Sequence, residues 1–180
     1  MNWFTSDTHF GHRNIIPYCK RPFASLEEME LELIRRWNFL VQPLDTVYHL
    51  GDVSFHGAIE TERILKQLQG NKVLVMGNHD RKWTNTKWKR MGFEETVGWN
   101  YMIQFQGQSV AMSHFPYDGG YEDGRDFSHH QIKDEGLPLL HGHVHMGWKQ
   151  NGKMINVGVD QWSYAPVSEN EILSLLEKKP

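Results

Sequence analysis

The sequence has little cysteine and no long apolar run, and both absences exclude classes of protein. Cys19 is the single cysteine among 180 residues, so neither an intrachain disulfide framework nor a cysteine-rich zinc module can form. No segment approaches the ~20 apolar residues that a membrane-spanning helix requires. The opening residues, MNWFTSDTHF, lack the basic and apolar regions of a secretory signal. We therefore expect a cytoplasmic protein with no membrane partner.

Cationic side chains are not in excess, which argues against a strongly basic nucleic-acid scaffold. The chain has 19 Lys and Arg against 22 Asp and Glu, a formal net charge of −3. A basic groove on a nearly neutral protein stays open. The densest cationic run, 81–90, fits either a solvated helix face or a contact along a substrate backbone. The length favours one domain over residues 1–180.

Hydrophobic periodicity predicts alternating strands and helices in the first half of the chain. The expected elements are strands over 2–6, 46–50 and 72–76, a helix that starts at residue 25, and a helix over 59–68. Ser25 and Glu28 form a capping box at the start of the first helix. Gly70 is the expected C′ residue of the second helix.

The second half is mostly strand. The expected elements are a hairpin of 101–105 with 109–113, strands over 139–140 and 154–159, and a final helix from the Ser168 and Glu171 capping box through residue 176. This order predicts the α/β fold class, with two sheets packed face to face and helices outside. The polar segment 117–136 fits either a functional loop or lid, or an ordinary surface loop.

Histidine is abundant, with eleven copies, and several copies follow predicted strands directly. Such strand ends are where side chains converge in open α/β sheets. The candidate ligands at these positions are Asp7, His9, Asp52, Asn78, His114, His143 and His145. Nitrogen and oxygen ligands of this kind suit Mn²⁺, Fe, Zn²⁺, Co²⁺ or Ni²⁺. Their number exceeds the ligand set of one catalytic zinc and fits two metals roughly 3.5–4 Å apart.

The His-Gly-His-Val-His run is the strongest single motif. His143 and His145 stand two residues apart, so on one strand both imidazoles point the same way. We therefore expect them on one strand face, reaching one site. His141 precedes them by the same spacing and is expected to support the ligands rather than bind metal.

The ordered blocks D-T-H, G-D, G-N-H-D, a lone H and G-H-V-H resemble those of the calcineurin-like metallophosphoesterases. The opening D-T-H-F-G-H-R-N-I-I further resembles a small bacterial and phage subgroup. The resemblance implies a four-layer α-β-β-α sandwich, the metallo-dependent phosphatase fold, with two mixed sheets flanked by helices. It also implies two divalent ions, with Mn²⁺ favoured. Asp7, His9 and His145 would bind the first, Asn78, His114 and His143 the second, and Asp52 would bridge them.

The resemblance also implies the reaction, which is attack on phosphorus by a hydroxide shared between the two metals, in line with the leaving oxygen. His79 matches the family's general acid, and Asp80 is expected to hold and polarise its imidazole. His12 and Arg13 follow the first motif and are candidate substrate contacts, although an ordinary loop histidine and a solvated arginine fit the sequence too.

Departures from the family pattern narrow the substrate class. The phosphoprotein phosphatases carry G-D-x-V-D-R-G and G-N-H-E, whereas here Asp52 is followed by V-S-F-H-G and His79 by Asp80. The resemblance therefore implies a phosphodiesterase acting on nucleotide-type or nucleic-acid-end substrates. A phosphomonoesterase and a dinucleotide pyrophosphohydrolase are the alternatives within enzymes, and an inactive scaffold on this fold is the alternative outside them. The oligomeric state stays open.

The remaining aromatic and histidine residues carry weaker expectations. His49 is expected to pack in the core or behind the ligands, and His56 is a weaker substrate candidate than His12. The pair 129–130 is expected to be a surface pair. Trp148 and Trp162 fit core packing better than stacking on a nucleobase.

Overall fold

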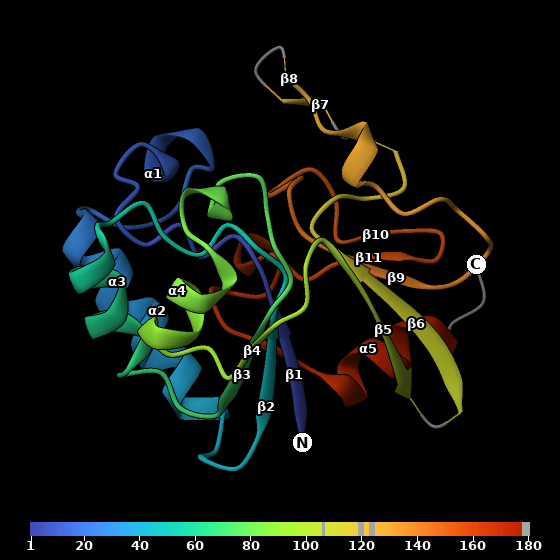
Figure 1. The fold of residues 1–180 in the computed structure, drawn as a ribbon, viewed down its shortest axis with the longest axis horizontal. Helices are drawn as coiled ribbons and strands as arrows, with labels where there is room; N and C mark the ends of the chain where they lie inside the picture. Colours follow the sequence, from blue (N-terminus) through green and yellow to red (C-terminus); the bar gives the residue numbers. More distant parts are fainter. Residues whose placement is uncertain (106, 119–120, 123–124, 178–180) are drawn as a thin grey trace.

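The computed structural model describes residues 1–105, 107–118, 121–122 and 125–177. Within these residues the first five-stranded sheet has the order β12-β1-β2-β3-β4 (Figure 1). Its strands are β1 (Asn2–Thr5), β2 (Thr46–His49), β3 (Asn71–Leu74), β4 (Glu95–Thr96) and β12 (Val167–Ser168). Strands β1 to β4 run parallel and β12 runs antiparallel to β1. The parallel strands therefore all end at the same edge of the sheet.

The second sheet has the order β10-β11-β9-β6-β5 in the described part of the chain. Its strands are β5 (Asn100–Phe105), β6 (Gln108–Ser113), β9 (Leu139–His141), β10 (Gln150–Asn151) and β11 (Met154–Asn156). Strands β6, β9 and β11 are parallel, whereas β5 and β10 are antiparallel edge strands. Both sheets are thus mixed. Residue 106, in the predicted hairpin turn, lies outside the described residues.

Helices cover the outer face of the first sheet. They are α2 (Leu26–Leu40), α3 (Ala58–Leu65) and α4 (Asn85–Met91), and the short α1 (Ile15–Tyr18) precedes them. The Ser25 side chain accepts the Glu28 N–H at 3.1 Å, as the capping box predicts. Met29 and Trp37 of α2 and Trp88 of α4 are buried against this sheet. The apolar stripe of each helix therefore forms one core.

A second core lies between the two sheets. Phe4, Leu50 and Val75 from the first sheet pack with Leu140 and Ile155 from the second. The C-terminal helix α5 (Glu169–Glu177) packs against β12 and β1 and adds buried apolar side chains to this core. The predicted α/β class, with two mixed sheets and flanking helices, is confirmed.

Two local predictions are wrong. Helix α3 ends at Leu65, so Gly70 is not its C′ residue; the φ of Gly70 is +86°, and it serves the turn before β3. Strand β9 ends at His141, so His143 and His145 do not share a strand face. The chain turns away from the sheet there, because the Val144 N–H bonds the Gly142 carbonyl at 2.8 Å and His143 has a φ of 70°.

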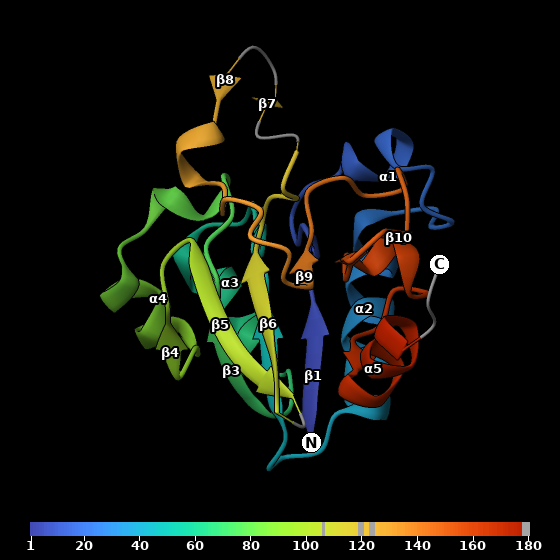
Figure 2. The same ribbon diagram turned by 90° about the vertical axis from the view of Figure 1, so that its right-hand side faces the viewer.

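Short elements complete the end of the molecule where the parallel strands finish. They are η1 (Asp80–Lys82), η2 (Ser128–His130), η3 (Val159–Gln161) and the small hairpin of β7 (Tyr121–Glu122) and β8 (Arg125–Asp126). Both views show this hairpin projecting from the same end as α1, opposite the N-terminus (Figures 1 and 2). The lid hypothesis for 117–136 falls partly outside the described residues and stays a prediction. Among the described residues, no helix is long and apolar enough to cross a membrane.

Candidate metal centre

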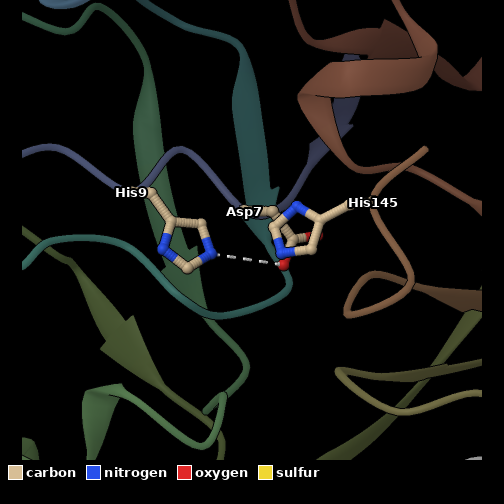
Figure 3. A group of neighbouring side chains, drawn as sticks. All are labelled: Asp7, His9 and His145. Carbon is tan, nitrogen blue, oxygen red and sulfur yellow. Dashed lines mark ion pairs between the residues drawn. The ribbon is translucent and has the colours of Figure 1, made fainter. Parts of the chain in front are cut away.

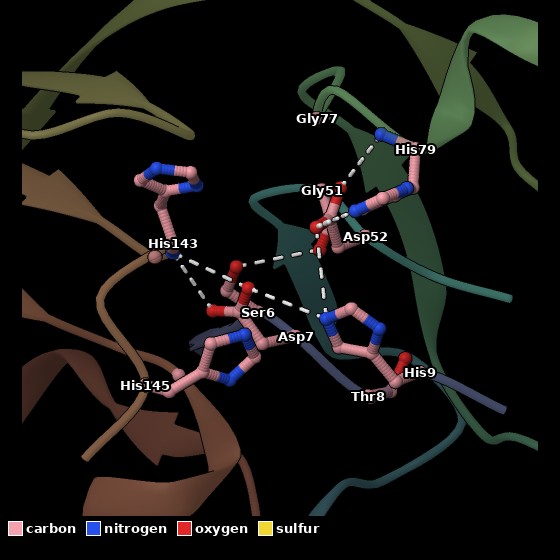
Figure 4. A network of polar contacts seen from close by, with 12 residues as sticks. Ser6, Asp7, Thr8, His9, Gly51, Asp52, Gly77, His79, His143 and His145 are labelled. Carbon is pink, nitrogen blue, oxygen red and sulfur yellow. Dashed lines mark hydrogen bonds and ion pairs between the residues drawn. The ribbon is translucent and has the colours of Figure 1, made fainter. Parts of the chain in front are cut away.

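Asp52 lies at the centre of the histidine cluster (Figure 4). Its Oδ2 atom is 3.5 Å from His114 Nε2, 3.6 Å from His9 Nε2 and 3.9 Å from His79 Nε2. The Asp52 side chain is nearly fully buried. It follows β2, whereas its three imidazole neighbours follow β1, β3 and β6. Both sheets therefore contribute to one site around a single carboxylate.

Asp7, His9 and His145 form one half of the cluster (Figure 3). One ligand atom from each of the three lies within 4.8 Å of the others. The rings of His9 and His145 are 5.0 Å apart, and His9 Nε2 is 3.9 Å from Asp7 Oδ1. The structure thus brings His145 to Asp7 and His9, which lie at the other end of the sequence.

His114 and His143 form the other half, and the predicted ligand Asn78 is buried in the loop that follows β3. The His114 and His143 rings are 5.2 Å apart. His114 Nδ1 lies 2.8 Å from the Leu50 carbonyl, which leaves Nε2 facing Asp52. Asp7, Asp52 and His114 also form a compact ligand group within 4.8 Å. His143 and His145 therefore lie in opposite halves of the cluster. On one strand face the two side chains would point the same way, so they could not separate in this manner.

Left-handed backbone conformations are concentrated in this cluster. Among the described non-glycine residues, eight have positive φ, and five of those are candidate ligands. They are Asp7 (57°), His9 (51°), Asp52 (58°), His143 (70°) and His145 (45°). Such conformations cost free energy and persist where the surrounding structure enforces them, typically at functional sites. The strain gives independent support to the importance of these positions.

Two glycines allow the loops of the cluster to approach one another. A Cβ atom at Gly142 would overlap the Ser6 hydroxyl and the Asp7 carboxylate, and one at Gly77 would overlap the Asp52 carboxylate. Any side chain at these positions would displace a candidate ligand. The glycines of the G-H-V-H and G-N-H-D blocks are therefore required by close packing.

Buried imidazole nitrogens without a hydrogen-bond partner show whether the candidate ligands fit a bound metal ion. Within the described residues, His9 Nε2 and His114 Nε2 are buried and have no hydrogen-bond partner. A buried polar atom without a partner is costly, and both atoms face Asp52. A divalent cation held between these nitrogens and the carboxylates would satisfy them. The residues present therefore fit bound metal.

The electrostatics also favour bound cations. Burial raises the pKa of Asp7, but nearby His145 and His114 outweigh it, and the net pKa lies below its ordinary value. Burial raises the pKa of Asp52, opposed by His114 and His79. Burial lowers the pKa of His145, but Asp7 and Asp160 raise it to about 11. The buried carboxylates thus favour positive charge on His145, whereas burial and the neighbouring His145 and Arg21 lower the pKa of His9 well below its ordinary value.

Asp80 is fully buried and bonds to the backbone of the cluster loops. Its Oδ2 accepts the N–H groups of Asp52 at 2.7 Å and Gly77 at 2.8 Å, and its Oδ1 accepts the Val53 N–H at 3.0 Å. The carboxylate therefore accepts three backbone donors and joins two loops of the cluster, which positions Asp52. The predicted contact of Asp80 with the His79 imidazole stays a prediction. The His79 backbone N–H donates to Asp52 Oδ1 at 3.0 Å.

Arg21 and Asp160 are functional residues that the sequence analysis missed. Asp160 Oδ2 is 3.0 Å from His145 Nδ1, and Arg21 donates to both Asp160 oxygens at 2.8 and 2.9 Å. Arg21 also donates to the carbonyls of Asp7 and Thr8. This pair fixes the His145 ring and the first loop. Asp160 follows a predicted strand, as Asp7 and Asp52 do, which is the signal that could have found it.

Cys19 lies close enough to His145 and Asp160 to form a second group of potential ligands. Both Asp160 oxygens already accept from Arg21, and Oδ2 also contacts His145 Nδ1. That arrangement leaves His145 Nε2 for the Asp7 side. The group formed by Asp7, His9 and His145 is therefore a better candidate metal site than the group that contains Cys19.

The candidate substrate contacts divide into two kinds. His12 lines an open pocket beside the cluster, with its Nδ1 3.3 Å from His9 Nδ1. Arg13 is exposed and lies outside the pocket lining, so the structure does not bring it to the site. His56 pairs with Glu30 at 2.7 Å, also outside that lining.

The other singled-out aromatic residues have structural contacts. His49 is buried, with its Nε2 3.0 Å from the Thr8 hydroxyl. The ring of His141 lies 4.6 Å from the Trp148 ring, and Trp162 donates to the Asn156 carbonyl at 2.8 Å. These residues support the loops around the cluster. His130 is not simply a surface residue, because it stacks on Trp99 at 3.6 Å.

The fold and the cluster together define an α/β protein with a candidate metal centre, and comparison with known proteins identifies the family. The model of the calcineurin-like phosphoesterase superfamily domain matches residues 3–161. The chain belongs to this family. The family is metal-dependent and acts on phosphate esters, and the Asp and His cluster is a potential metal-binding site in accordance with it.

Relatives span nearly the whole chain. An uncharacterized protein of Methanocaldococcus jannaschii, MJ1445, is 35% identical over 98% of this chain and 91% of its own length. The gene 66 protein of Mycobacterium phage D29 is 32% identical over 89% of this chain and 88% of its own. The crystal structure of AQ665 from Aquifex aeolicus, a protein of unknown function, superposes with a TM-score of 0.77 at 32% identity, covering 97% of this chain and 98% of that one.

Proposed function

We propose that this protein is a dinuclear-metal-dependent phosphodiesterase that acts on nucleotide-type or nucleic-acid-end substrates. The observation that carries the proposal is the position of Asp52, whose single buried oxygen lies 3.5–3.9 Å from imidazoles of both halves of the cluster. In the proposal Asp52 is shared between two sites. Asp7, His9 and His145 hold one Mn²⁺, and Asn78, His114 and His143 hold the other.

The two ions, when bound, supply a nucleophilic water near neutral pH and neutralise phosphate charge. The protein's contribution is to fix its ligands before substrate arrives. The Leu50 carbonyl sets the His114 tautomer and Asp160 sets that of His145, as partners behind metal ligands commonly do. Asp80 and Arg21 hold the loops that carry Asp52 and Asp7.

His79 is the proposed proton donor to the leaving oxygen. Its ring is partly exposed, lines the open pocket and lies 3.9 Å from Asp52 Oδ2. The backbone bond to Asp52 fixes its distance from the cluster. A histidine at the edge of a phosphate site can transfer a proton to an alkoxide as the phosphorus–oxygen bond breaks.

The test is hydrolysis of a substrate panel with Mn²⁺, Ni²⁺ and Zn²⁺. The panel contains bis-p-nitrophenyl phosphate, p-nitrophenyl phosphate, 2′,3′- and 3′,5′-cyclic nucleotides, a dinucleoside polyphosphate and short oligonucleotides. We expect faster diester than monoester hydrolysis with Mn²⁺, and no turnover by the Asp52→Asn control. A monoester preference would favour a phosphomonoesterase, and a polyphosphate preference a pyrophosphohydrolase. No hydrolysis of any compound with any metal would contradict the proposal and favour an inactive scaffold.

A further inference from the structure

An open pocket of about 810 Å³ adjoins the metal centre. His9 and His145 belong to both the cluster and the pocket lining, so the two are continuous. The volume is within the ~300–1,000 Å³ of typical small-molecule sites. Helix α1 and the loops after β1, β2, β3 and β9 supply the walls. A ligand whose phosphate reaches the cluster would place the rest of its structure in this pocket.

Part of the pocket wall is apolar and aromatic. Phe55, Tyr18 and Met146 line it and remain 38%, 69% and 44% exposed. Such large apolar side chains gathered at an opening indicate a binding surface. None of the three is explained by the reaction itself, because phosphate hydrolysis needs no aromatic wall.

Phe55 is held as a flat platform against three histidine rings of the site. Its ring stacks on His12 at 4.1 Å with an interplanar angle of 18°, and lies 5.3 Å from the His9 ring at 23°. The His79 ring is 4.8 Å away. A ring packed between imidazoles loses little freedom when a ligand stacks on its exposed part. The platform is therefore organised before binding.

We propose that this pocket binds the nucleoside part of the substrate, with the base lying against Phe55, Tyr18 and Met146. The proposal rests on the proposed function, because it takes the phosphate site from it. Buried cation-binding groups at one end and an aromatic, thioether-bearing wall at the other match a ligand with a phosphate and a planar ring. Aromatic side chains bind bases through their faces without regard to sequence, and methionine sulfur adds contacts to ring edges.

The test compares two ligands that differ only in the base. Adenosine 5′-monophosphate and ribose 5-phosphate are titrated by calorimetry into Mn²⁺-loaded protein. We expect the nucleotide to bind roughly five- to hundredfold more tightly than ribose 5-phosphate, because a base stacks favourably on aromatic side chains. Phe55→Ala should reduce that preference to less than about threefold while ribose 5-phosphate affinity is kept. Tyr18→Ala, at an exposed position that cannot affect the core, should reduce it as well.

Ile59→Ala is the matched control. Ile59 is 88% exposed on α3 and lies outside the pocket lining, so its truncation should leave the preference unchanged. Equal binding of the two ligands by the wild-type protein would overturn the proposal, as would binding of neither. An unchanged preference in both Phe55→Ala and Tyr18→Ala would also overturn it.

Calorimetry separates this proposal from the proposed function. Selective nucleotide binding without hydrolysis of any ester would support the pocket and contradict the phosphodiesterase. Hydrolysis of bis-p-nitrophenyl phosphate with no nucleotide preference would support the phosphodiesterase and overturn the nucleoside pocket.

Discussion

At the scale of single residues, the site depends on which nitrogen of each imidazole faces inward. His114 is oriented by a backbone carbonyl and His145 by the Asp160 carboxylate. The Asp160 side chain is 1% exposed and is held by the bidentate Arg21. A buried partner of this kind fixes both the tautomer and the ring plane of a metal ligand.

Replacing Asp160 with Asn should weaken metal binding without abolishing the fold. We expect Mn²⁺ affinity to fall about 10–100-fold, the usual cost of losing a residue that orients a metal ligand. The measurement is equilibrium titration with Mn²⁺. Asp45→Asn is the control, because Asp45 is a buried carboxylate at the opposite end of β2, bonded to Trp3 Nε1 at 2.9 Å. Equal Mn²⁺ affinity in the two variants would show that Asp160 has only a structural role.

Replacing His79 with Ala should slow the chemical step selectively. Turnover of an alkyl diester should fall by about 10²–10⁴-fold, the range for loss of a general acid, whereas an activated aryl ester should be affected much less. Metal content should persist, because His79 is not in either proposed ligand triplet. Kinetics on the two esters, with metal analysis of the same samples, checks this. Equal losses on both esters would contradict the acid role.

The sequence predicts the positions of the ligands better than their geometry. Asp7, Asp52 and Asn78 end parallel strands, and such strands place their ends at one edge, so their proximity follows from the pattern. The different directions of His143 and His145 depend on a turn after β9 that periodicity does not reveal. The contacts that Asp80 makes also could not be predicted, because they are with backbone N–H groups of another loop.

At the scale of elements, the loops after β1 and β9 pack so closely that no side chain fits between them. Replacing Gly142 with Ala places a Cβ against Ser6 and Asp7. We expect the free energy of unfolding to fall by about 1–3 kcal/mol, the usual cost of overpacking, and Mn²⁺ affinity to fall with it because Asp7 must move.

Denaturant unfolding with and without Mn²⁺ measures both effects of Gly142→Ala. Gly57→Ala is the matched control, because a Cβ at Gly57 would meet nothing within 4 Å; its unfolding free energy should change by no more than about 0.5 kcal/mol. Similar values for the two variants would contradict the close approach of these loops.

The elements themselves are largely predictable because their signals are local. The Ser25 capping box starts α2 where expected, and each predicted strand of the first sheet is present. The ends are less well predicted: β3 stops at Leu74 and α3 at Leu65. These limits are set by contacts between sheets and loops, which a local pattern does not contain.

At the scale of the whole molecule, the buried histidines make stability depend on pH. Burial lowers the pKa of His49 to about 3, whereas in the unfolded chain it is ~6.5. The unfolded state therefore binds the additional proton between these values, and stability falls as pH drops below ~6.5. Urea unfolding of metal-free protein at pH 7.5, 6.0 and 5.0 should show this loss. His49→Gln should flatten the pH dependence, and an unchanged slope would contradict the buried neutral state.

In the proposed function, the activity of the whole molecule depends on two metal ions that share the buried Asp52 carboxylate. Anomalous diffraction from Mn²⁺-soaked crystals tests this most directly. We predict two anomalous peaks flanking the Asp52 carboxylate, one beside Asp7, His9 and His145 and the other beside Asn78, His114 and His143. A single peak, or a peak between Cys19 and Asp160 with none at Asp52, would contradict the dinuclear site.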